Sequence, residues 1–136
     1  MENEKLICLA LEARNKAYVP YSNYKVGAAL LSKSGKVYQG CNIENAAYTP
    51  TNCAERTAFF KAISEGEREF EAIAIVGGHQ EELTTYAYPC GVCRQVMMEF
   101  CHPEHFKIIT AISMDNYVEC TLSELLPNGF GPANLI

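Results

Sequence analysis

The sequence predicts an α/β protein in which helices cover a mixed sheet of about five strands. Stretches with apolar residues at helical spacing alternate with short apolar runs, of which the run over residues 70–76 is rich in Ile and Val. With 136 residues, the chain is long enough to bury one hydrophobic core. We therefore expect a single domain over residues 1–136.

Each expected element follows from its apolar spacing and from the Gly, Pro or polar residues at its ends. In chain order these are a helix over residues 3–18, strands over 24–31 and 36–42, a helix over 53–64, a strand over 70–76, a polar loop over 79–88, a helix over 91–101, strands over 106–112 and 117–121, and a helical turn over 122–126. The β-α-β-α-β order in the middle indicates parallel pairing there. Asn3 is expected to cap the first helix, and Thr51 or Asn52 the second.

The composition is typical of a globular protein, with 49% hydrophobic and 20% charged residues. The net charge is −5 and there is no basic block, which disfavours a nucleic-acid partner and favours a small substrate. The first residues, Met-Glu-Asn-Glu-Lys, do not resemble a signal peptide. No apolar run approaches the roughly 20 residues that span a bilayer. We therefore expect a cytoplasmic protein without a membrane partner.

Three of the seven cysteines fall in two short clusters. The first reads Thr51-Asn52-Cys53-Ala54-Glu55-Arg56, and the second reads Pro89-Cys90-Gly91-Val92-Cys93. Both clusters stand at expected helix starts, where the helix macrodipole and the free N–H groups favour a thiolate. Without a secretory signal, metal binding is a better interpretation than a disulfide framework. The other cysteines are expected to be small buried hydrophobic residues, namely Cys8, Cys41, Cys101 and Cys120.

The two clusters together favour a catalytic zinc site. A Cys-x-x-Cys pair alone also suits a redox dithiol or half of a structural zinc site. A redox pair would not need a third cysteine at a separate helix start, and a closed structural site needs a fourth ligand. No histidine stands in a cluster at ligand spacing; the three are His79, His102 and His105. We therefore predict that Cys53, Cys90 and Cys93 hold one Zn²⁺ with a position open for water.

Glu55 lies two residues after the first cysteine of the expected site. A glutamate in the first turn of a helix usually serves as a capping carboxylate. Beside a metal thiolate it can instead move protons to and from a zinc-activated water, and we predict this catalytic role for Glu55.

Three thiolates leave the zinc centre with a net negative charge, which opposes acidification of the zinc-activated water. Arg56 is expected to offset this charge by donating hydrogen bonds to the sulfurs, and Arg94 is the second candidate for the same role. The simpler interpretation of Arg56 is a solvated residue on the helix surface.

Along nearly its whole length, the chain resembles the small, homotetrameric type of zinc-dependent cytidine deaminase. The matching blocks are YSNYKVGAA (21–29), GCNIENAAY (40–48), CAERTA (53–58), PCGVCRQ (89–95) and LLP (125–127). The resemblance implies a three-layer α/β/α fold with a mixed five-stranded sheet, a Zn²⁺ cofactor and a homotetramer. It also implies hydrolytic deamination of cytidine and deoxycytidine to uridine and deoxyuridine, with release of ammonia, in pyrimidine salvage.

The resemblance assigns further roles in substrate binding. Asn42 and Glu44 match the residues that hydrogen-bond the ribose, and their i, i+2 spacing at a strand end would point them the same way. A polar turn is the simpler interpretation of this pair. Tyr24 stands where the family usually has a phenylalanine against the pyrimidine, and the backbone of Ala54 would bind the base. A neighbouring subunit would complete the pocket through Ala46, Tyr48 and Phe130, which could otherwise be core or tail residues.

Other functions remain open on the residues alone. A related zinc enzyme could act on another aminopyrimidine nucleoside, such as a nucleoside antibiotic, or on a nucleotide. RNA- and DNA-editing deaminases share this type of centre, but the acidic composition and short length argue against one. A zinc-binding module without activity predicts four protein ligands and leaves Glu55, Asn42 and Glu44 unexplained. A redox dithiol protein predicts no metal.

Overall fold

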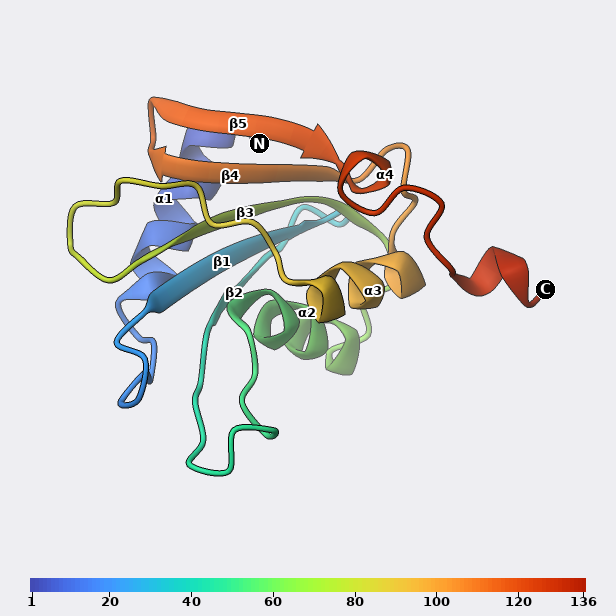
Figure 1. The fold of residues 1–136 in the computed structure, drawn as a ribbon. Coiled ribbons are helices and arrows are strands. Elements are labelled where there is room, and N and C mark those ends of the chain that lie inside the picture. Colours follow the sequence, from blue (N-terminus) through green and yellow to red (C-terminus); the bar gives the residue numbers. More distant parts are fainter.

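The computed structural model describes residues 1–136 and shows a five-stranded sheet with helices on both faces (Figure 1). The helices are α1 (Asn3–Arg14), α2 (Ala54–Ser64), α3 (Gly91–Phe100) and α4 (Leu122–Leu125), and a 3₁₀ turn covers Pro132–Asn134. The strands are β1 (Lys25–Ser32), β2 (Val37–Cys41), β3 (Phe70–Gly78), β4 (Lys107–Ser113) and β5 (Asn116–Thr121). The predicted α/β class is confirmed, and every predicted helix and strand is present.

The strand order in the sheet is β2-β1-β3-β4-β5. Strands β3 and β4 pair in parallel, and all other neighbours pair antiparallel. The predicted mixed sheet is therefore confirmed, but parallel pairing is limited to one pair because β1 lies between β2 and β3. The short β1–β2 connection forces an antiparallel hairpin, and the crossover through α2 then places β3 at the other edge of β1.

The sheet separates two hydrophobic cores, which makes the fold three-layered. On one face α1 packs against the sheet, and on the other face α2 and α3 do so, as Figure 1 shows. Strand β3 supplies both cores in alternation, since Ala74 faces α1 whereas Ile73 and Ile75 face α2 and α3. Phe59 of α2 and Met97 of α3 are completely buried in the second core. This packing places the starts of α2 and α3 at the same side of the sheet.

A glycine on β2 allows α2 to lie unusually close to the sheet. A Cβ atom at Gly40 would stand 2.4 Å from the carbonyl oxygen of Ala54 and 2.6 Å from the amide nitrogen of Ala58. Both are backbone atoms, which cannot move aside as the end of a side chain can. Gly27 on β1 does the same for α1, because its Cβ would stand 2.1 Å from the carbonyl oxygen of Ala10. The absence of these two side chains therefore sets the distance from each helix layer to the sheet.

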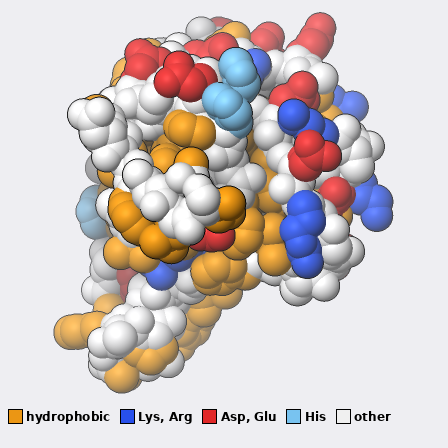
Figure 2. Space-filling model, turned by 90° about the vertical axis from the view of Figure 1, so that its right-hand side faces the viewer, with side chains coloured by type: hydrophobic (Ala, Val, Ile, Leu, Met, Phe, Trp, Pro, Cys, Tyr) orange, Lys and Arg blue, Asp and Glu red, His pale blue; other side chains and the backbone are white.

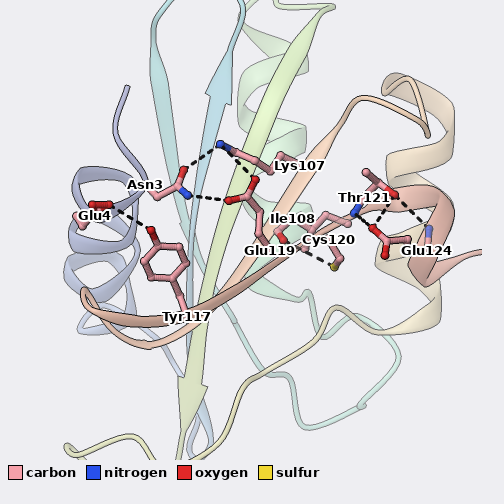
Figure 3. Close-up of polar contacts among 9 residues, drawn as sticks. All are labelled: Asn3, Glu4, Lys107, Ile108, Tyr117, Glu119, Cys120, Thr121 and Glu124. Carbon is pink, nitrogen blue, oxygen red and sulfur yellow. Dashed lines mark hydrogen bonds and ion pairs between the residues drawn. The ribbon is translucent and has the colours of Figure 1, made fainter.

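The first helix differs from the prediction at both ends. It ends at Arg14 instead of residue 18, because residues 15–17 form tight turns and Tyr18 then bridges to Ile43. Asn3 is not the N-cap; Glu2 takes that position without a side-chain bond. The Asn3 amide instead donates to Glu119 and accepts from Lys107, which connects α1 to β4 and β5 (Figure 3).

The cysteines outside the two clusters are less buried than predicted. Only Cys101 is buried, where it joins the core beneath α3. Cys41 and Cys120 are half-buried, and Cys8 is exposed. Position 8 lies on the solvent side of α1, because the inward face is taken by Leu6, Ile7 and Ala10.

Candidate metal-dependent active site

Helices α2 and α3 bring the three predicted cysteines together. Cys53 is the N-cap residue of α2, Cys90 is the N-cap residue of α3, and Cys93 lies in the first turn of α3. The three Sγ atoms lie within 4.8 Å of one another, and those of Cys53 and Cys90 are 3.8 Å apart. The fold thus brings together Cys53 and Cys90, which are 37 residues apart in the sequence.

The predicted caps of α2 are wrong. Neither Thr51 nor Asn52 holds the cap position, and Cys53, which does, makes no side-chain cap bond. The Asn52 amide donates to Thr57 Oγ1 instead, at 3.1 Å. The Cys53 sulfur is therefore free to face the other two sulfurs beyond the helix end.

The donor set of this cluster fits zinc. Zinc prefers thiolate and imidazole ligands in tetrahedral sites, and a catalytic site leaves one position for water. No histidine, aspartate or glutamate adds a fourth ligand atom to the group of three sulfurs. His79 contacts the ring of Tyr24, while His102 and His105 stack on each other. The geometry is that of an open three-thiolate site.

Glu55 is buried at this cluster, with 4% of its surface exposed. Burial and, to a smaller extent, the negative charge of Cys53 together raise the pKa of its carboxyl group to about 7. A carboxyl group with such a pKa can both accept and donate a proton near neutral pH. Its burial and its place in the pocket lining distinguish it from an exposed capping glutamate.

Arg56 reaches the sulfurs from the same turn of α2. Its Nη2 atom donates to Cys53 Sγ at 3.2 Å, while its Nε atom is buried without a partner. The pKa of Cys53 falls to about 5, through the hydrogen bond from Cys93 and, against the effect of burial, the bond from Arg56. Arg94 points elsewhere: it donates to the carbonyl oxygens of Pro89 and Leu125, which connects α3 to α4.

A cavity of about 240 Å³ opens beside the cysteine cluster. The residues predicted from the sequence that line it are Tyr24, Asn42, Cys53, Ala54, Glu55 and Cys90. Five further lining residues were not predicted, namely Val26, Ile75, Tyr86, Ala87 and Tyr88. The last three belong to the stretch read as a polar loop. Tyr86 and Tyr88, two aromatic residues within three positions of Pro89, are the signal in the sequence that could have indicated them.

Asn42 and Glu44 are both engaged in hydrogen bonds at the edge of this region. The Asn42 amide accepts from Val26 N at 2.9 Å and donates to Tyr24 O at 2.8 Å. The Glu44 carboxylate accepts from the backbone amides of Tyr21 and Ser22 and from the Ser22 hydroxyl. These bonds lower the pKa of Glu44, the Ser22 hydroxyl having the largest effect. Asn42 lines the cavity, whereas Glu44 does not.

Ala46, Tyr48 and Phe130 are exposed and lie outside the cavity. Tyr48 is 73% exposed and has a positive φ of 64°, which is costly for a residue with a side chain. It belongs to a long loop between β2 and α2 that projects from the sheet (Figure 1). Figure 2 shows hydrophobic side chains gathered on the lowest part of the molecule, where this loop lies.

The fold and the site together define a zinc-dependent hydrolytic enzyme, with three sulfur ligands and a buried glutamate at a cavity. A family model described as the cytidine and deoxycytidylate deaminase zinc-binding region matches residues 1–112. A cytidine deaminase of Sporosarcina psychrophila is 50% identical over 135 residues, which are 99% of this chain and 96% of the relative. One of Halalkalibacterium halodurans is 52% identical over 130 residues, 96% of this chain and 95% of that protein.

Solved structures give the same result. The crystal structure of cytidine deaminase from Burkholderia pseudomallei matches with a TM-score of 0.87 and 47% identity, over 96% of this chain and 100% of that one. This chain therefore belongs to the cytidine deaminase family of zinc-dependent hydrolases. None of its helices has the length and apolar character that a bilayer crossing requires.

Proposed function

We propose that this chain converts cytidine and deoxycytidine to uridine and deoxyuridine by hydrolysis, with release of ammonia. The observation that carries the proposal is the buried Glu55 beside three clustered sulfurs in the cavity lining. The names of the relatives, cytidine deaminases with up to 52% identity among those described above, support the same substrate. In the reaction, a C4–O bond forms and the bond from C4 to the amino nitrogen breaks.

In this proposal Cys53, Cys90 and Cys93 hold one zinc ion per chain. Zinc, when bound there, supplies a Lewis acid that lowers the pKa of a water molecule toward about 7. Glu55 accepts a proton from the water and delivers it to N3 of the pyrimidine; it then takes the second proton from the C4 hydroxyl group and passes it to the leaving amino group. Its raised pKa suits it to both directions of transfer. Arg56 holds the Cys53 sulfur and offsets the negative charge of the cluster.

Asn42 and Glu44 have capacity left for a ribose hydroxyl. An amide nitrogen carries two hydrogens, and Asn42 uses one of them for Tyr24 O. A carboxylate has about four acceptor positions, of which Glu44 uses three on Tyr21 and Ser22. We assign the ribose to this pair, the pyrimidine face to Tyr24 and a base contact to the backbone of Ala54.

The cavity lining favours a nucleoside over a nucleotide. It contains no lysine, arginine or histidine that could bind a phosphate group. Arg56 is bonded to Cys53, and the nearby Arg14 is bonded to three backbone carbonyl oxygens. A substrate with a 5′-phosphate would therefore find no cationic partner among the lining residues.

We also assign to this chain the homotetramer of the family that it resembles, and a cytoplasmic role in pyrimidine salvage. Ala46, Tyr48 and Phe130 would complete the pocket of a neighbouring subunit. Their exposure and the positive φ of Tyr48 support this assignment, because an exposed aromatic residue on a projecting loop can be buried by a second chain.

The proposal is tested by ultraviolet absorbance of cytidine mixed with the purified protein, with zinc measured on the same sample. Loss of the cytidine band with about one zinc per chain is the expected result. Cytidine 5′-monophosphate and free cytosine serve as comparison substrates, and we expect both to react more slowly. Zinc-loaded protein that leaves cytidine unchanged would contradict the proposal and indicate another aminopyrimidine nucleoside.

Glu55→Gln separates the catalytic role of this residue from a structural one. The amide has the same shape but cannot carry the proton, so turnover should fall by about 10²–10⁴-fold or more while zinc content stays unchanged. Glu65→Gln, at the exposed end of the same helix, is the matched control and should keep full activity. Substantial turnover by Glu55→Gln would show that another group moves the proton.

A further inference from the structure

One wall of the cavity is built by the loop between β3 and α3. Tyr86, Ala87 and Tyr88 of this loop line the cavity and directly precede Pro89 and the predicted zinc ligand Cys90. The loop has no helix or strand of its own. Its shape must therefore come from contacts made by individual residues.

The start and middle of this loop are held firmly. Arg14 of α1 is buried and donates to the carbonyl oxygens of Gly78 and Gln80, at 2.8 and 2.6 Å. Leu83 is buried in the core beneath α1. These contacts leave residues 84–88, of which the last three line the cavity, to be held separately.

Residues 84–88 make no backbone hydrogen bond to any part of the protein. Ala87 is buried, but its methyl group offers only apolar contact. The one hydrogen bond of the segment is a side-chain bond: the Tyr86 hydroxyl donates to Asn116 Oδ1 at 2.6 Å. Asn116 is the first residue of β5, at the turn after β4, and thus belongs to the rigid sheet.

We propose that Tyr86 is a positioning residue, whose hydrogen bond to Asn116 holds the cavity wall at Ala87 and Tyr88 in the shape that binds the nucleoside. The inference rests on the proposed function. Without this bond, residues 84–88 would have to be ordered each time a substrate enters, and that ordering would weaken binding. The substrate and the transition state would lose the same amount of binding free energy, so KM should rise and kcat should stay unchanged.

Tyr86→Phe removes only the hydroxyl and keeps the ring in the cavity wall. We expect KM for cytidine to rise about three- to tenfold, the range that one lost hydrogen bond corresponds to, with kcat within about twofold of the wild-type value. Asn116→Ala should have the same effect. The double variant should be no worse than either single variant, because each change removes the same bond.

Tyr117→Phe is the matched control, one residue further along β5. The Tyr117 hydroxyl donates to Glu4 of α1 at 3.4 Å, on the part of the sheet drawn in Figure 3, and Tyr117 does not line the cavity. Loss of the Tyr117 hydroxyl group should leave KM unchanged, even if this variant has a lower melting temperature. Zinc content should be equal in all variants, because Arg94 holds the start of α3 through Pro89.

Limited proteolysis with a protease of broad specificity gives a readout that does not need turnover. Tyr86→Phe should speed cleavage within residues 84–88, and Tyr117→Phe should not. If the wild type deaminates cytidine but Tyr86→Phe keeps the same KM or the same rate of cleavage, the positioning role is wrong and the proposed function stands. If the wild type does not deaminate cytidine, the proposed function fails and this role fails with it.

Discussion

At the scale of single residues, we propose that Arg56 adjusts the zinc site through a hydrogen bond to a cysteine sulfur and not by binding the metal. Its guanidinium donates to Cys53 Sγ at 3.2 Å, and its Nε atom is buried without a partner. Arg56→Ala would remove this donor and leave the charge of three thiolates uncompensated. Zinc affinity should fall by about 10–100-fold, as for other residues that hold metal ligands in place.

A chelator competition titration measures this loss directly. Arg68→Ala is the control, since Arg68 is exposed and donates to the carbonyl oxygens of Ile63 and Glu67 beyond the site. We expect the control to resist chelation as the wild type does. If Arg56→Ala resisted chelation as well as the wild type does, zinc binding by the three sulfurs would not depend on the guanidinium.

At the scale of elements, the site depends on how closely α2 approaches β2. Gly40→Ala would place a Cβ atom 2.4 Å from Ala54 O, so the helix start must shift with the ligand Cys53 and with Glu55. We expect a loss of about 1–3 kcal/mol in the free energy of unfolding, typical of overpacking, together with weaker zinc binding. Thermal unfolding and zinc titration measure the two effects.

Gly27→Ala provides the matched comparison. It makes an equally close contact, 2.1 Å to Ala10 O, but with α1 on the opposite face. No predicted zinc ligand lies on α1. It should therefore destabilise the protein and leave zinc affinity unchanged. If both variants lost zinc equally, the effect would be general destabilisation and not displacement of α2.

At the scale of the whole molecule, the proposed tetramer predicts that subunits can complement one another. A chain with Tyr48→Ala keeps Glu55 but lacks the side chain proposed to enter a neighbour's pocket. A chain with Glu55→Gln lacks its own proton carrier but still supplies Tyr48. Mixed oligomers of the two chains should therefore be more active than either variant alone, which co-expression and a cytidine assay would test.

Analytical ultracentrifugation of the wild type is needed beside that experiment. We expect a species of four chains. Tyr48→Ala with full activity of its own would place Tyr48 outside the substrate site, and a monomeric wild type would remove the basis for complementation. Either outcome would leave the zinc cluster and Glu55 as the core of the proposal.

Much of the site could be predicted because its signals are local. Cys90 and Cys93 are three residues apart, which places them on one helix turn. Cys53 and Glu55 are two residues apart at the start of another helix. Helix and strand positions follow from apolar spacing, which is also local. The helix ends were less predictable. Cys53, and not Thr51, is the N-cap residue of α2, because the path of the chain before the helix decides where the helical conformation begins.

The sequence by itself determined the class of fold, the two cysteine clusters and the choice of Glu55, since each depends on residue types at short spacing within one segment. Only the tertiary structure decided that β1 separates β2 from β3 and that Tyr86 meets Asn116 at one wall of the cavity. These contacts join segments about 30 or more residues apart. No local pattern encodes such a pairing, because it depends on how the helices and strands between the two segments pack.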